Sequence, residues 1–155
     1  MNENELKVET ITLMGLKLPS KTTNENNQSM EDCGELWARF EKEEIFLKIP
    51  NRLSDEVLAV YYDYEGDHTE PFSYFIGCKV EEGTELPDDL NSLTIAAGKY
   101  QKVTAKGQMP DCIANKWREI WDSDIPRAYN TDFEVYDKRS QDWNDAEVDI
   151  YLSVL

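Results

Sequence analysis

The order of local patterns along this chain repeats once, and this repetition constrains the fold more than any other feature of the sequence. Residues 5–82 contain a strand pattern, a helix pattern and two further strand patterns, and the same order returns over residues 91–155. Such a repeat indicates two copies of one supersecondary unit. We therefore expect one α+β domain over residues 1–155, built from two pseudo-symmetric βαββ units with an antiparallel sheet and two main helices.

The two halves also match residue by residue. When the sequence is laid over itself so that Tyr61 falls on Tyr136, the same offset places Ile76 on Tyr151. A slightly larger offset aligns the apolar positions of the two helices, with Leu36 on Ile113. The match covers two strands in register, so it predicts which residues occupy equivalent places in the two halves.

Strand patterns are runs rich in β-branched and aromatic residues. They occupy residues 5–18, 55–65, 71–82, 93–107, 131–137 and 147–155. Helix patterns, in which apolar residues recur at helical spacing, occupy residues 35–49 and begin again at Pro110, ending near Asp122. Residues 20–34 are polar, and we expect a loop there. The runs 55–65 and 71–82 are joined by the turn-like sequence GDHTE and should pair as a hairpin.

The charge of the chain is strongly negative. It carries 32 acidic and 16 basic residues, for a formal net charge of -16. This charge repels the phosphate backbone of nucleic acids and the anionic surface of membranes, so neither is an expected partner. It suits a cationic ligand or a basic protein partner, although an acidic surface also serves solubility alone.

The residue patterns of several common functional sites are not found in this sequence. The cysteines stand at positions 33, 78 and 112 without a paired spacing, which argues against disulfides and structural zinc. The single histidine, His68, lies in the GDHTE turn, where we expect it to be solvent-exposed, so no catalytic triad is predicted. No glycine-rich phosphate loop and no calcium loop is present. We expect no cofactor and no metal, and a cytoplasmic protein with no leader or membrane span.

Glu134 is our candidate for the charged residue of a ligand site. Alternate residues of 148–154 are apolar and should pack against the helices, which leaves Tyr151 on the opposite face of that strand. Phe133 matches the apolar set by alternation. Glu134 and Tyr136 are therefore predicted to share the face of Tyr151.

The offset that lays Tyr61 over Tyr136 also places Tyr61, Tyr74 and Ile76 on the corresponding face of the first half. Tyrosines with a few carboxylates are typical of a concave ligand site, and a carboxylate among aromatic rings suits a cation. The alternative is a solvated sheet face on which Glu134 is simply exposed. Trp37 and Trp117 lie at helical spacing, which predicts core positions with one edge free to reach a cavity.

The chain resembles the GyrI-like family, the effector-binding domains of AraC-type and MerR-type transcription regulators. It is most similar to stand-alone members of the integron-cassette type. The resemblance covers about residues 5–155. The segments that carry it, in order, are ELWARFEKEEI, IPNR, VYYDYEGD, SYFIGCKV, IAAGKYQKVTAKG, NKWREIWDSDIPR and DFEVYD.

This resemblance implies a SOUL-type fold, in which two βαββ units enclose a ligand cleft. In such domains the acidic residue of an E-x-Y strand motif lies in the cleft and meets cationic or polar aromatic ligands, and here that residue is Glu134, with Tyr136 completing the motif. The resemblance implies a small-molecule binding protein of the drug-sensing kind. No helix-turn-helix segment precedes residue 5, so a regulatory role would need a separate partner.

Two other functions remain open at this point. The resemblance also admits a hydrolase of cyclopropane-type genotoxins, with Glu134 as the base and Tyr136 or Tyr61 as a hydrogen-bond donor. It admits equally an acidic protein-interaction module such as a gyrase modulator. Binding is favoured over catalysis because no second catalytic residue can be assigned. The ligand itself and the oligomeric state are not specified by these patterns.

Overall fold

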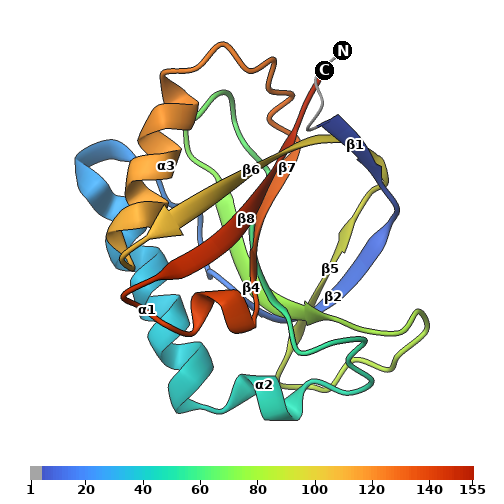
Figure 1. The fold of residues 1–155 in the computed structure, drawn as a ribbon. Coiled ribbons are helices and arrows are strands. Elements are labelled where there is room, and N and C mark those ends of the chain that lie inside the picture. The colour runs from blue at the N-terminus through green and yellow to red at the C-terminus, as the bar shows by residue number, and fades with distance from the viewer. Residues whose placement is uncertain (1–4) are drawn as a thin grey trace.

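The computed structural model describes residues 5–155, whose strands form one eight-stranded antiparallel sheet (Figure 1). The strands are β1 (Glu5–Val8), β2 (Ile11–Lys17), β3 (Val57–Tyr62), β4 (Ser73–Lys79), β5 (Asn91–Ile95), β6 (Gly98–Gly107), β7 (Thr131–Tyr136) and β8 (Ala146–Ser153). The α-helices are α1 (Gln28–Lys42), α2 (Ile45–Lys48) and α3 (Asp111–Trp121), and short 3-10 helices cover Glu25–Asn27 and Lys138–Ser140.

The strand order shows the internal symmetry of the molecule. The sheet runs β1-β6-β8-β7-β3-β4-β2-β5, so the order β3-β4-β2 on one side of the centre is matched by β7-β8-β6 on the other. The central pair, β3 and β7, places Ala59 opposite Glu134. Each half runs through two consecutive strands, its helical segment and two further strands, β1 to β4 in the first half and β5 to β8 in the second. With the first two strands of each half counted as one bent strand, this order confirms the α+β fold with two pseudo-symmetric βαββ units.

The sheet curls because two short connections join its opposite ends. β1 lies at one end of the strand order, yet only Glu9 and Thr10 separate it from β2 near the other end. Ala96 and Ala97 join β5 to β6 in the same way. A flat sheet of eight strands, spaced about 4.8 Å apart, could not be spanned by two residues. The predicted single strands 5–18 and 93–107 are therefore each two strands, one at either end of the sheet.

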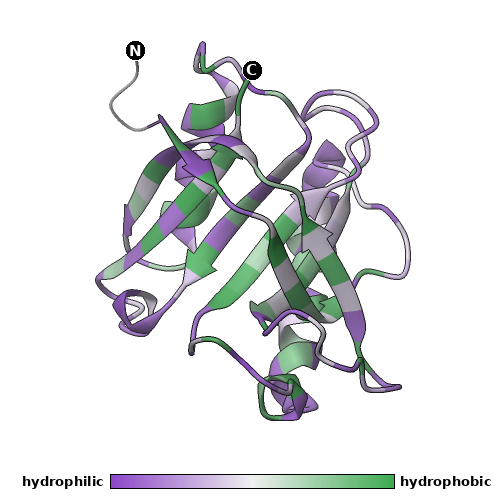
Figure 2. Ribbon diagram, turned by 90° about the vertical axis from the view of Figure 1, so that its right-hand side faces the viewer, coloured by the Kyte–Doolittle hydropathy of each residue, from purple (hydrophilic) through white to green (hydrophobic). Residues whose placement is uncertain are grey.

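Each face of the curled sheet buries its own apolar cluster. Alternation along the strands, visible as changing colour in Figure 2, sends side chains to the two faces in turn. One face encloses a core made by Leu13, Leu58, Val60, Phe75, Ile95, Tyr100, Phe133 and Val135. The other face is covered by helices, with α1 over β2 and β4 and α3 over β6 (Figure 1).

Two helix predictions need correction. Helix α1 begins at Gln28, within the stretch 20–34 that was predicted to be a loop, because polar residues there bond to one another, as Gln28 does to Asp32 at 2.9 Å. The predicted helix 35–49 is also interrupted. Glu44 adopts a left-handed conformation, and the turn brings Ile45 into the core at the start of α2.

Helix α3 lies where it was predicted, after Pro110. None of the helices in residues 5–155 is long and apolar enough to cross a membrane.

Candidate functional site

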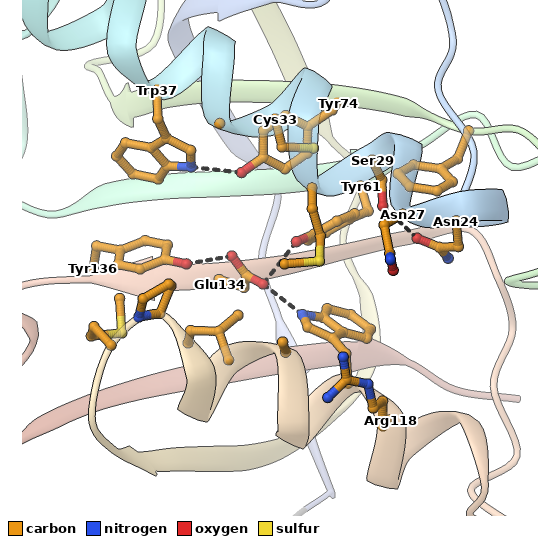
Figure 3. Close-up of a pocket in the computed structure, with 18 of the residues that line it drawn as sticks. Asn24, Asn27, Ser29, Cys33, Trp37, Tyr61, Tyr74, Arg118, Glu134 and Tyr136 are labelled. Atoms are coloured by element: carbon orange, nitrogen blue, oxygen red, sulfur yellow. Dashed lines mark hydrogen bonds between the residues drawn. The ribbon is translucent and has the colours of Figure 1, made fainter.

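A cavity of about 830 Å³ lies between α1 and α3, above the centre of the sheet. Figure 3 shows residues of both helices and of the strands between them pointing into it. Nine of the residues that line it are Trp, Tyr or Phe. The rings come from Trp37, Tyr61, Tyr64, Phe72, Tyr74, Trp117, Trp121, Tyr136 and Trp143. A space of this size and character matches that of sites for drug-sized molecules.

Glu134 lies in the wall of this cavity and is 1% exposed. Its Oε2 accepts hydrogen bonds from the Tyr61 hydroxyl at 2.8 Å and from Trp117 Nε1 at 2.6 Å (Figure 3). Its Oε1 accepts one from the Tyr136 hydroxyl at 2.6 Å. The three donors come from β3, α3 and β7, so the carboxylate is held by both halves of the molecule.

A second set of contacts fixes these donors in place. Trp37 Nε1 donates to the Tyr74 hydroxyl at 2.8 Å, and the Tyr74 ring packs edge-on against Tyr61 at 5.0 Å between centroids. The Trp37 ring packs against Tyr136 at the same separation. Tyr61 also contacts Trp117. The rings around the carboxylate therefore form one packed group whose geometry is set before any ligand arrives.

Within residues 5–155, the Glu134 carboxylate is buried without an ion-pair partner. Burial raises the pKa of its carboxyl, and the hydrogen bonds from Tyr136, Trp117 and Tyr61 oppose that rise. Within residues 5–155 no lysine or arginine forms an ion pair with it. Burial, followed by the charge of Glu134, raises the pKa of Tyr61 and Tyr136, so both remain hydrogen-bond donors.

Among the cysteines of the described residues, Cys33 alone lines the cavity. Burial raises the pKa of its thiol far above the ordinary value, and the charge of Glu134 adds to the rise. Only the thiolate attacks electrophiles efficiently. Cys33 is therefore a poor nucleophile and serves as part of the apolar wall.

A buried ion pair lies at the edge of the same cavity and was not predicted. Arg127 Nη2 contacts Asp132 Oδ2 at 2.5 Å, and Tyr64 donates its hydroxyl to the same oxygen at 2.6 Å. Arg127 and Tyr64 line the cavity, whereas Asp132 lies behind them on β7. The sequence signal for this pair is faint, because Arg127 stands in an irregular segment outside the predicted elements.

Six of the eight residues predicted for the site line the cavity: Glu134, Tyr136, Tyr61, Tyr74, Trp37 and Trp117. Ile76 does not; it is fully buried in the core beneath α1. Tyr151 lies on the opposite face of the sheet, where its ring stacks on Phe133 at 4.8 Å. The prediction that Glu134 shares the face of Tyr151 is wrong.

The strand register explains this error. Directly paired residues point to the same face, and Glu134 pairs with Ile150 while Phe133 pairs with Tyr151. The apolar residues of β8 and the Glu134 carboxylate therefore share the helix-covered face.

The same register corrects the alignment of the two halves. Ala59 pairs with Ile76 in the first half, as Glu134 pairs with Ile150 in the second. If Ala59 is equivalent to Glu134, Ile76 is therefore equivalent to Ile150. The alignment from the sequence placed Ile76 on Tyr151, the next position along the strand, and a slip of this kind reverses the face.

The mouth and one end of the cavity are formed by residues that sequence reasoning missed. Met30 on α1 and Trp143 before β8 line the cavity and are 57% and 59% exposed. His68 is half-buried, not exposed as predicted: its ring stacks on Trp121 of α3, and its carbonyl accepts a hydrogen bond from Asn24 at 2.8 Å. These three regions become neighbours only through the fold, so no local pattern indicates them.

The chain and its fold are similar to those of known proteins. The sequence model of one family, Cass2, described as integron-associated effector binding protein, matches residues 6–154. The structure is similar to that of an integron cassette protein from the mobile metagenome of Vibrio cholerae, with a TM-score of 0.71 and 26% identity, covering 98% of this chain and 95% of that one.

Two further relatives are similar. SAV2435, solved bound to tetraphenylphosphonium, has a TM-score of 0.79 at 19% identity, covering 100% of this chain and 94% of that one, and it shows the shared GyrI-like fold. YobU of Bacillus subtilis (strain 168), a candidate transcriptional regulator, is 25% identical over 123 residues, 77% of each chain.

Proposed function

The chain belongs to the family of integron-associated effector binding proteins, related to the ligand-binding domains of transcription regulators, and from this premise we propose that it captures an aromatic cation. The ligand lies in the cavity between α1 and α3, and Glu134 is its charge partner. One observation carries the proposal. The fully buried Glu134 carboxylate, which has no ion-pair partner among residues 5–155, faces a cavity lined by aromatic rings.

Burying an unpaired charge costs several kcal/mol, and a cationic ligand offsets that cost by supplying the missing charge. The aromatic faces around the cavity add cation-π attraction, which is strongest where water is excluded. A carboxylate has about four lone-pair sites, and Tyr61, Trp117 and Tyr136 use three of them. The group is therefore oriented by its donors and still open to a cation. The same charge discriminates against anionic ligands.

Tetraphenylphosphonium is a suitable probe for this proposal. It carries one delocalised positive charge and four rings, and it is the molecule with which the structurally similar SAV2435 was solved. A cavity of about 830 Å³ can hold it.

The test is isothermal titration calorimetry of tetraphenylphosphonium with the wild-type chain and with Glu134→Gln. Removing one partner of a buried charge pair costs ~2–5 kcal/mol. We therefore expect affinity to fall at least about tenfold. The matched control is Glu41→Gln, which removes a carboxylate that also lines the cavity but lies exposed on α1. It should change affinity less than about twofold. Equal affinity of Glu134→Gln and the wild type, with the circular dichroism spectrum unchanged, would contradict the proposal.

A further inference from the structure

Arg127 carries hydrogen-bond donors that nothing in residues 5–155 accepts. Its side chain is 3% exposed, and Nη2 is used by Asp132. Nε and Nη1 are buried and have no partner among the described residues. Buried polar atoms are nearly always hydrogen-bonded, so orphaned donors of this kind indicate a place where a water, an ion or a ligand binds. Arg127 lines the cavity that holds Glu134, which makes a ligand the relevant candidate.

What Arg127 lacks is an acceptor rather than a charge. Asp132 already neutralises the guanidinium, and the rings of Tyr129 and Trp117 lie 4.3 and 5.6 Å from its Cζ. Asp132 cannot turn to serve the orphaned nitrogens, because its oxygens also accept from Tyr64 and from the backbone and hydroxyl of Ser153. A neutral oxygen completes the set without placing a new charge in the site.

Trp117 connects this group to the proposed cation site. Its indole N–H donates to Glu134 at 2.6 Å, while Arg127 lies near its ring. A ligand that lies along this one indole therefore meets a carboxylate at the N–H edge and a guanidinium near the ring. The two protein groups differ in sign, and so they select different chemical groups on one molecule.

We propose that Arg127 forms a second polar subsite that binds an oxygen acceptor of the ligand, so that the preferred ligand is an aromatic cation bearing a carbonyl group. This inference rests on the proposed function for the cationic part of the ligand. Because both nitrogens are buried, binding includes a small displacement of the Trp117 ring or the guanidinium. The resulting hydrogen bond is shielded from water and correspondingly strong.

The experiment compares two phosphonium probes that differ in one group. (4-Oxopentyl)triphenylphosphonium carries a ketone, and (4-methylpentyl)triphenylphosphonium carries a CH–CH₃ unit in its place, so both have one positive charge and nearly the same shape. Calorimetry with the wild-type chain should show the ketone binding at least about fivefold more tightly. Equal affinities in the wild-type chain would overturn the proposal, and this measurement needs no variant.

Two variants locate the effect. Arg127→Lys keeps a cation for Asp132 but loses the planar fork of donors, so the preference for the ketone should fall to about one. Arg118→Lys is the matched control, since Arg118 also lines the cavity but is exposed and bonded to Asn115. It should keep the preference. A folded Arg127→Lys that retains the full preference overturns the proposal.

The Glu134→Gln variant separates this inference from the proposed function. It should weaken both probes by the same factor and leave their ratio unchanged, because the ketone does not contact the carboxylate. If neither probe binds the wild-type chain, the proposed function fails and the acceptor subsite fails with it. If both bind equally and both depend on Glu134, only the acceptor subsite is lost.

Discussion

At the scale of single residues, burial of the ionised Glu134 carboxylate lowers the stability of the folded protein. Three hydrogen bonds compensate this loss in part, yet the pKa of the carboxyl still lies above the ordinary value of 4.5. A carboxyl whose pKa is higher in the folded than in the unfolded chain stabilises the fold at low pH, where it is protonated. That contribution is lost as the pH rises through the folded-state pKa.

This sign gives a prediction for stability. The free energy of unfolding of the wild-type chain should fall relative to that of Glu134→Gln as the pH rises from about 4 to 7, because only the wild type must ionise a buried group. Urea unfolding of both chains at several pH values measures the difference, in which the contributions of the other acidic residues cancel. A difference that stays constant, or that grows in favour of the wild type, would contradict the assigned direction.

At the scale of elements, the paired strands β2 and β4 approach so closely that neither can carry a side chain where Gly15 lies opposite Gly77. Gly15 and Gly77 are direct register partners. A Cβ on Gly15 would collide with the Ile76 carbonyl oxygen, and one on Gly77 with the Met14 carbonyl oxygen. Backbone atoms cannot move aside as flexible side chains do. The close approach is therefore a fixed part of the sheet beneath α1.

Alanine substitution tests this close approach. Gly15→Ala should lower the free energy of unfolding by about 1–3 kcal/mol, the usual cost of overpacking. The matched control is Gly34→Ala within α1, where an added Cβ meets nothing within 4 Å. It should raise stability by about 0.4–1 kcal/mol through helix propensity and loss of freedom in the unfolded chain. Urea denaturation of the two variants should thus give opposite signs, and destabilisation by both would argue against the steric account.

Some helices and strands could be predicted from the sequence and others could not. Alternation and helical spacing predicted β3, β4, β7, β8 and α3 near their observed bounds, because each buries a continuous apolar stripe. They could not predict the face of β8 relative to β7, since that depends on a register offset of one residue, and residues on both faces of β8 are buried. Tyr151 was assigned to the site for this reason. The start of α1 was missed because its first turns are polar.

Two further features lay beyond prediction. Arg127 and Asp132 are only five residues apart, but Arg127 stands in an irregular segment, so no helical or strand periodicity indicates their ion pair. The mouth of the cavity joins α1 to the segment before β8, which are far apart in the sequence, and no local spacing encodes such a contact. By contrast, the family resemblance carried by DFEVYD singled out Glu134, and the structure places this residue in the wall of the cavity.

At the scale of the whole molecule, the chain carries a net charge of -16 and contains a cavity that we propose to be cation-selective. Such a charge attracts cations over a distance set by the Debye length, about 30 Å at 0.01 M salt and about 8 Å at 0.15 M. Its effect should therefore appear in the rate of encounter more than in the lifetime of the complex.

Stopped-flow binding of tetraphenylphosphonium tests this separation. The association rate constant should fall several-fold between about 0.01 and 0.15 M salt, whereas the dissociation rate constant should change little. Glu134→Gln alters the net charge by only one unit, so its association rate should show the same salt dependence while its dissociation is faster. An association rate that does not respond to salt would show that the acidic surface serves only solubility.

The chain contains four tryptophans, and all four, Trp37, Trp117, Trp121 and Trp143, line the cavity that holds Glu134. No tryptophan elsewhere in the sequence contributes background emission. The protein is therefore its own optical reporter: unlabelled material should change its fluorescence intensity or colour when the cavity fills. Single replacements by phenylalanine would then reveal which part of the cavity each compound occupies.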